Sequence, residues 1–216
     1  LFRVVCFMTD GLIGNDMQIL DAIQKNRHQA RVFAFGIGNG VNRFLLENMG
    51  REGRGATEIV TLESDGDAAV KRFHERIQNP VLTDIAFTFD GVEVTDLTPA
   101  AETIPDLFDA QPIFITGRYS GHGKGTVTVT GNTGAGPYER TLTLDFPKVE
   151  EDHDVLSSLW ARNQIDDLMA RDWMGMQTGN PVADVEERIT QLGLEYGLLT
   201  QFTSFVAIEE IARTTG

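Results

Sequence analysis

The sequence has few of the residues from which disulfide frameworks, zinc sites or membrane-spanning helices are built. Its 216 residues include one cysteine, Cys6, so no disulfide can form within the chain. Its four histidines fall in four separate segments, without the spacing of a zinc site. No apolar stretch approaches the roughly 20 residues that span a bilayer, and no charged-then-apolar leader opens the chain. Zinc and a membrane-spanning helix are therefore not expected, and the sequence leaves the compartment open.

Positive charge is also scarce. The chain carries 18 Lys and Arg against 32 Asp and Glu, which gives a formal net charge of -14. Such a balance repels phosphate backbones and anionic membrane surfaces, so nucleic acid is not expected as a partner. Hydrophobic residues make up 41% of the chain, enough to bury a core in one large domain or two small ones.

The first third of the chain alternates short apolar runs with amphipathic stretches. The pattern predicts strands at Phe2–Met8, Arg31–Gly36 and Thr57–Leu62, each followed by a helix. Because the first run is apolar throughout, we expect it to be buried on both faces, with Cys6 as a small core residue. Residues 1–79 are therefore predicted to form part of a doubly wound parallel sheet, with the three strands adjacent in chain order.

The pattern changes after Asn79-Pro80. Residues 80–149 show period-two alternation broken by Asp-Gly and glycine-rich turns, which predicts an antiparallel, β-sandwich-like module. Helical periodicity returns in residues 150–216, and the tail over Leu198–Ile208 is expected to return to the β module as a strand. The fold class is thus α/β plus all-β, with a helical segment at the end.

Asp10 is the principal candidate site residue. It closes the first predicted strand in Thr9-Asp10-Gly11, and ligands of open α/β sheets lie beyond the carboxyl ends of the strands. A carboxylate there, followed by a glycine that permits a tight turn, is a candidate metal ligand. Since Leu1 is not a natural initiator and already lies in a strand pattern, the amino end resembles an excision, and we expect the site to have been cut in half.

A glycine-rich turn offers an alternative function. Gly36-Ile37-Gly38-Asn39-Gly40 stands between a predicted strand and a predicted helix, the setting of a dinucleotide site, but the third glycine of the motif would fall at Val41. A plain strand-to-helix turn is favoured over a nucleotide-dependent enzyme. No catalytic triad or pair of carboxylates stands in a recognisable context, so we expect a non-enzyme with no catalytic residues.

Several motifs together resemble a known family. The segments Thr9-Asp10-Gly11, Arg31 to Gly38 and Asn42 with Leu45-Leu46 resemble the second half of a von Willebrand factor A domain. Two later segments resemble the region that follows this domain in inter-alpha-trypsin inhibitor heavy chains, which contain VIT and A domains, and in their bacterial relatives: Leu159-Trp160-Ala161-Arg162 and Leu194 to Val206. The resemblance covers nearly the whole chain and implies a fragment of such a protein, of bacterial origin.

The resemblance implies an adhesion function. In that family a metal-ion-dependent adhesion site holds Mg²⁺ or Ca²⁺, and Asp10 matches its aspartate at the end of the fourth strand. The other ligands would precede Leu1, so we expect this fragment to bind no cation tightly. The implied protein is secreted or on the cell surface and binds a protein or extracellular-matrix partner. Self-association through the exposed first strand is also expected, and a purely structural scaffold segment is the remaining alternative.

Overall fold

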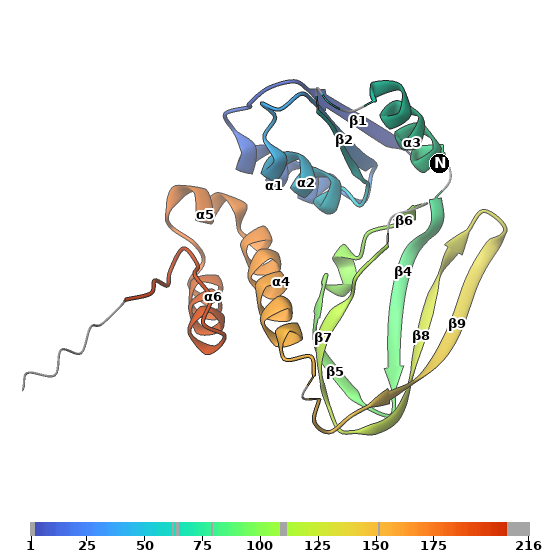
Figure 1. Cartoon of the computed structure of the whole chain (residues 1–216), viewed down its shortest axis with the longest axis vertical. Helices are drawn as coiled ribbons and strands as arrows, with labels where there is room; N and C mark the ends of the chain where they lie inside the picture. The colour runs from blue at the N-terminus through green and yellow to red at the C-terminus, as the bar shows by residue number, and fades with distance from the viewer. Residues whose placement is uncertain are drawn as a thin grey trace, which may run out of the picture.

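The computed structural model of the chain describes residues 3–61, 63, 65–78, 80–108, 112–150 and 152–206. Its first part is a three-stranded parallel sheet of β1 (Val4–Thr9), β2 (Arg31–Ile37) and β3 (Thr57–Val60), in that order. Each strand is followed by a helix: α1 (Asp16–Asn26), α2 (Arg43–Glu52) and α3 (Gly66–Gln78). Figure 1 shows this α/β unit above the remainder of the molecule. The predicted order and parallel direction of the three strands are confirmed.

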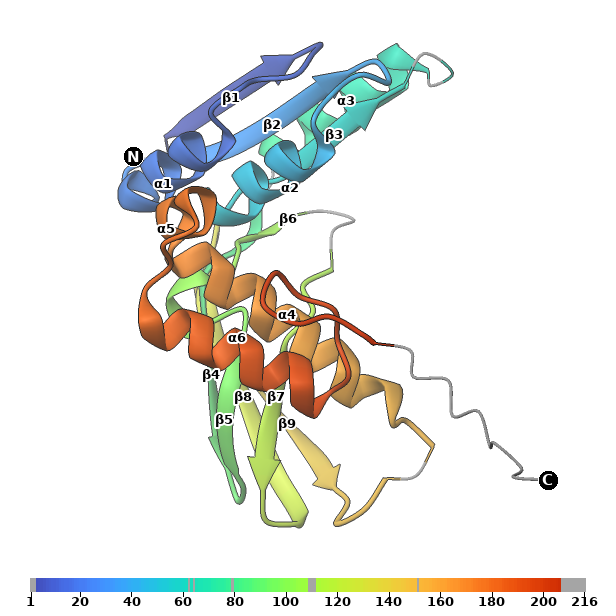
Figure 2. The ribbon, with the colours of Figure 1, turned by 90° about the vertical axis from the view of Figure 1, so that its left-hand side faces the viewer.

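Helices cover both faces of the sheet, as Figure 2 shows. Side chains of β2 alternate between the two layers. Val32 and Ala34 pack with the buried residues of α1 and α2, whereas Phe33 and Phe35 pack against Phe73 of α3. The central strand is thus buried on both faces, which explains its continuous apolar sequence.

The first strand is less buried than its sequence predicts. β1 is at the edge of the sheet, and Val4, Val5 and Met8 are 38%, 50% and 67% exposed. Cys6 is exposed as well, so the expectation of a core cysteine is wrong. Cys6 and Met8 lie in register with Phe33 and Phe35, but α3 packs over the latter pair and leaves β1 open. The apolar sequence of β1 therefore indicates that its side chains can be buried, but it does not show which element covers them.

The second part consists of two antiparallel sheets. β4 (Pro80–Asp90), β6 (Leu107–Phe108), β8 (Gly123–Thr133) and β9 (Gly136–Phe146) form one sheet in the order β6-β4-β8-β9, and β5 (Glu93–Thr98) pairs with β7 (Thr116–Ser120). Apolar side chains of both sheets line one cleft. The antiparallel module is confirmed, and its description as a sandwich stays a prediction. We refer to it as the β module.

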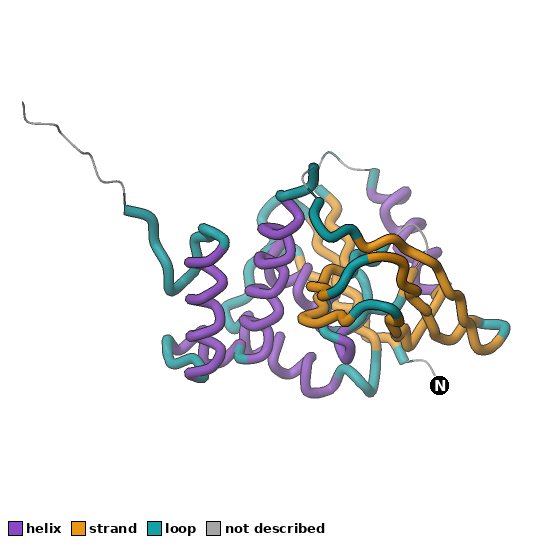
Figure 3. The backbone as a smooth tube through the Cα atoms, turned by 90° about the horizontal axis from the view of Figure 1, so that it is seen from below, coloured by secondary structure: helices purple, strands orange, loops and turns teal. Residues whose placement is uncertain are grey.

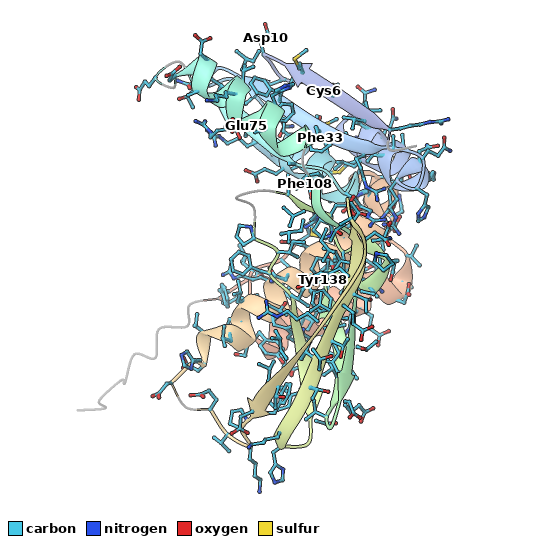
Figure 4. All side chains as sticks on the ribbon, turned by 90° about the vertical axis from the view of Figure 1, so that its right-hand side faces the viewer. Cys6, Asp10, Phe33, Glu75, Phe108 and Tyr138 are labelled. Atoms are coloured by element: carbon cyan, nitrogen blue, oxygen red, sulfur yellow. The ribbon has the colours of Figure 1, made fainter. Side chains whose placement is uncertain are left out.

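Short strand β6 joins the β module to the α/β unit. Its Phe108 is 1% exposed and meets Phe33 of β2 edge to face, with ring centroids 5.2 Å apart. Figure 4 labels both rings at the boundary between the two parts. Phe108 therefore completes the core under α3 from outside the parallel sheet.

The helical segment packs beside both parts, and Figure 3 shows its helices along one side of the strands. It contains α4 (Val155–Arg171), α5 (Trp173–Thr178) and α6 (Ala183–Glu195). A separate 3₁₀ turn in the β module, η1 (Ala101–Thr103), precedes β6. Trp160 Nε1 and Gln164 Nε2 donate to the Asp96 carbonyl oxygen at 3.0 and 2.7 Å, which fixes α4 to β5. Trp173 packs with α1 and α2. None of the helices described is both long and apolar enough to cross a membrane.

The expected C-terminal strand is wrong for the described part of the tail, residues 198–206. These residues form no strand and pack, through Leu198 and Phe202, against α4 and α6. A local turn explains the difference: Thr203 Oγ1 donates to the Leu198 carbonyl oxygen at 2.8 Å and accepts from Thr200 N at 3.0 Å. The segment is folded back on itself instead of being extended. Residues 207 and 208 of the predicted strand lie outside the described residues.

Candidate functional site

Asp10 lies where the sequence places it, directly after the carboxyl end of β1. Thr9 Oγ1 lies 3.3 Å from both the amide nitrogen and the carbonyl oxygen of Gly11, so a tight turn follows the strand. Asp10 is exposed, and Figure 4 shows it at the outer tip of the α/β unit, far from Phe108. Its carboxylate is therefore accessible to a cation or a partner from solution.

Two further polar side chains meet at the same edge of the sheet. Asn42 caps α2, since its Oδ1 accepts from Leu45 N at 3.1 Å, and its Nδ2 donates to Asp16 Oδ2 at 2.5 Å. Asp16 begins α1, where a negative charge complements the helix dipole. Its second oxygen, Oδ1, is buried without a hydrogen-bond partner in the described part of the chain. The starts of α1 and α2 are thus tied together next to the strand ends.

Asp10 is not part of a cluster of metal-binding side chains among the described residues. Among them no three His, Cys, Asp or Glu side chains gather closely enough to hold a metal ion. Mg²⁺ and Ca²⁺ take six or more oxygen ligands. The exposed carboxylate of Asp10 fits the chemistry of one such ligand, and the rest of the sphere would have to come from groups other than these.

The glycine-rich turn between β2 and α2 is explained by packing. A Cβ atom on Gly36 would lie 2.6 Å from Leu46 Cδ1 and 3.2 Å from Val41 Cγ2, so a larger residue would force the buried Leu46 side chain of α2 to shift. Gly38 has a φ of +92°, which L side chains rarely adopt. These two requirements account for Gly36 and Gly38 without a bound nucleotide, whereas a Cβ atom on Gly40 would meet nothing within 4 Å.

Three carboxyl groups with raised pKa values lie between α2 and α4. Burial raises the pKa values of Glu52, Asp166 and Asp167, and the nearby Arg51 guanidinium lowers each of them in part. Arg51 Nε donates to Glu52 Oε1 at 3.3 Å, and Ala100 N donates to Asp167 Oδ2 at 3.2 Å. Displaced pKa values occur in structural ion networks as well as in active sites. Here the contacts link α2, α4 and the segment before η1.

The pairing of Asp16 with Asn42 is not indicated by any sequence motif. A signal was available, because both follow the ends of adjacent parallel strands and begin the next helix. Carboxyl ends of parallel strands meet at one edge, so their first helical residues are brought together. The pairing itself depends on side-chain geometry that the spacing does not report.

The chain is similar over most of its length to curated proteins of two kinds. A von Willebrand factor A domain-containing protein of Dictyostelium discoideum is 26% identical over 212 residues, which cover 96% of the chain. Inter-alpha-trypsin inhibitor heavy chain H3 of Homo sapiens is 25% identical over 218 residues, which cover 94% of the chain. The chain spans 10% of the first relative and 24% of the second.

The comparison with solved structures includes a von Willebrand factor type A from Catenulispora acidiphila. It has a TM-score of 0.41 and 14% identity, and the match covers 91% of this chain and 56% of that one. No protein-family model matches the chain. Both protein groups named by the sequence motifs are thus found among the relatives, while the half-domain boundary and the bacterial origin stay predictions.

Proposed function

We propose that this chain is part of a binding module that recognises a protein or extracellular-matrix partner through Mg²⁺ or Ca²⁺ at the carboxyl edge of the parallel sheet. The observation that carries the proposal is the position of Asp10, which is exposed at the end of β1 and at the tip of the α/β unit. Similarity to von Willebrand factor A domain-containing proteins and to inter-alpha-trypsin inhibitor heavy chains supports it. An acidic side chain of the partner would supply the last ligand.

In this proposal Asp10 is one member of a larger metal-ion-dependent adhesion site. The other oxygen ligands come from groups beyond the described residues, as in a domain of which this chain is the second half. Each missing ligand must be replaced by water, so the 216-residue chain alone lacks the preorganised charge of a complete site. We propose a secreted or cell-surface location for the whole protein, since its function would be adhesion.

The test uses Asp10→Ala in the longer protein, with Asp145→Ala on β9 as the control. Both variants remove one exposed carboxylate, but only Asp10 lies at the proposed cation site. Adhesion that depends on Mg²⁺ and is lost in EDTA should disappear in Asp10→Ala and persist in Asp145→Ala. Adhesion that is equal in both variants would contradict the proposal and favour the structural scaffold.

Calorimetry on the 216-residue chain tests the incomplete site. Mg²⁺ should bind weakly, and Asp10→Ala should change little. Tight Mg²⁺ binding that is lost in Asp10→Ala would show that the remaining ligands lie within the chain. The same instrument separates the binding module from the nucleotide-dependent enzyme, because NAD or ATP should give no saturable heat if the turn at Gly36 serves only packing.

We also propose that the edge of β1 pairs with a further strand, either in a longer protein or in a second copy. β2 is the only described strand that pairs with β1, and Val4, Val5 and Met8 keep large apolar areas in water. Exposed apolar edges recruit strands because their backbone donors and acceptors are unpaired.

A further inference from the structure

A basic pocket lies at the amino edge of the parallel sheet, opposite the edge that carries Asp10. Arg3 immediately precedes β1, Arg31 begins β2, and Arg54 lies in the connection from α2 to β3. Because parallel strands start at the same edge, the three arginines converge there. With parts of the loop before β2 and of β4 they line a cavity of about 360 Å³: Arg3, His28, Gln29, Ala30, Arg31, Arg54 and Asp84.

Two of the guanidinium groups are held in place by a buried carboxylate. The side chain of Asp106 is 0% exposed, and it accepts from Arg31 Nε and from Arg54 Nη2, the latter at 2.8 Å. The side chains of Arg31 and Arg54 are only 11% and 12% exposed. A guanidinium group that is already oriented and partly desolvated loses little further freedom when it binds an anion.

The carboxylate of Asp84 is held more loosely. It is 57% exposed and lies 3.4 Å from Arg31 Nη2 and 3.3 Å from Arg54 Nη2, long distances for charge-assisted hydrogen bonds. Arg54 Nε is buried without a hydrogen-bond partner in the described part of the chain. The pocket therefore contains a carboxylate that a stronger anion can displace, beside an arginine whose hydrogen-bonding capacity is not fully used within the described residues.

The sign of the charge at the pocket is opposite to that of the molecule. The chain has a formal net charge of -14, yet among the described residues three guanidinium groups lie here with two carboxylates. Fields of distant charges are screened over about 8 Å at physiological ionic strength, so the local excess of positive charge governs a ligand in the pocket.

We propose that this pocket binds a tetrahedral oxyanion, a phosphate or sulfate group, either as a free ion or at the end of a small organic ester. Its oxygens would accept from Arg3, Arg31 and Arg54 and would take the place of Asp84. Arginine pairs with such groups through parallel hydrogen bonds, which is why it is favoured for phosphate recognition. The site is independent of Asp10, which lies at the opposite edge.

Titration calorimetry with inorganic phosphate, and separately with sulfate and O-phosphoserine, tests the proposal on the full chain. Arg3 is exposed, so Arg3→Gln leaves the buried Asp106 contacts intact. We expect this variant to weaken phosphate binding about tenfold, as loss of one charge-assisted contact predicts. Lys124→Gln on β8, also exposed, removes the same charge from the β module and should leave the Kd unchanged.

Asp84→Asn is expected to strengthen phosphate binding, in contrast to Arg3→Gln. Asp84 has a φ of +50°, a conformation that asparagine also tolerates, so the backbone is kept while the competing charge is removed. Phosphate should then bind about three- to tenfold more tightly. Tighter binding of O-phosphoserine than of phosphate would indicate an ester ligand, and the reverse a free ion. Absence of saturable binding of all three probes, or equal affinity in Arg3→Gln, Asp84→Asn and the wild type, would overturn the proposal.

Discussion

At the scale of single residues, burial determines how the charged groups between the parts of the molecule behave. Glu52 on α2 is 5% exposed, and burial raises its pKa above the ordinary value of 4.5 while Arg51 opposes the rise. The ionised form is therefore disfavoured in the folded chain relative to the unfolded chain. Its hydrogen bond from Arg51 keeps the residue in place in spite of this cost.

We predict that Glu52→Gln stabilises the chain at neutral pH. Because the folded pKa is raised, the folded state binds the proton more readily, and stability falls as pH rises from about 4.5 through the folded pKa. Glutamine keeps the shape without the buried charge, so its Tm should exceed that of the wild type at pH 7 and converge on it toward pH 4. For a chain of this size each kcal/mol corresponds to about 2–4 °C. A Tm difference that does not change with pH would contradict this cause.

A second prediction concerns Asp106, whose buried carboxylate pairs with Arg31 and Arg54. Asp106→Asn should lower the free energy of unfolding by about 3–5 kcal/mol, because two largely buried guanidinium groups lose their compensating charge. Asp84→Asn, at a partner 57% exposed, should cost less than about 1 kcal/mol. Urea denaturation measures the free energy of unfolding of both variants. Equal decreases would contradict the prediction that the burial of Asp106 makes its ion pairs more important for stability.

The three arginines of the pocket, Arg3, Arg31 and Arg54, also show which features of a site the positions of residues in the sequence can predict. The sequence shows one arginine at or shortly before each of the three parallel strands, and Asp10 at the end of the first. The partners are not visible: Asp106 comes from a segment 75 residues after Arg31, and its burial follows from how the β module docks. Local pattern therefore located the edges of the sheet, and tertiary contacts determined which charges meet there.

At the scale of elements, the strands and helices with clear periodicity were predictable and those without it were not. The parallel strands and the antiparallel pairs follow from apolar runs and turn residues. β6 has two residues, too few for any period, and the tail over 198–206 is bent by threonine hydrogen bonds that compete with an extended strand. β6 nonetheless supplies Phe108 to the core under α3.

We predict that Phe108→Ala destabilises the chain far more than its two-residue strand implies. Phe108 is 1% exposed and contacts Phe33, so its removal should cost about 3–5 kcal/mol through lost burial and an unfilled cavity. Phe114→Ala is the matched control, since Phe114 is 77% exposed and should change stability by less than about 0.5 kcal/mol. Thermal melts of the two variants decide the point, and similar Tm values would show that β6 is not part of the core.

At the scale of the whole molecule, contacts at several places hold the α/β unit to the rest of the chain. Phe108 enters the core beneath α3, Asp106 binds arginines of the sheet edge, and Trp173 of α5 packs on α1 and α2. Gln24 Nε2 of α1 also donates to the Ala170 carbonyl oxygen of α4 at 2.9 Å. The open side of the sheet is left at β1, on the far side of β2 from β3.

Two opposing effects decide whether copies of the chain associate through that open side. Strand pairing at β1 would bury Val4 and Met8 and satisfy backbone groups, whereas the net charge of -14 on each copy repels the other. Salt screening shortens the range of this repulsion from about 30 Å at 0.01 M salt to about 8 Å at 0.15 M. It leaves the backbone hydrogen bonds of strand pairing intact. We therefore predict that the chain is monomeric at low salt and forms dimers as salt is raised.

Sedimentation velocity of two variants tests this prediction. Met8→Lys on β1 should prevent the dimer, because a charge on an open edge strand blocks pairing. Leu194→Lys, which adds the same charge at a site 73% exposed on α6, should not. Dimers that form equally in both variants would place the contact elsewhere on the surface.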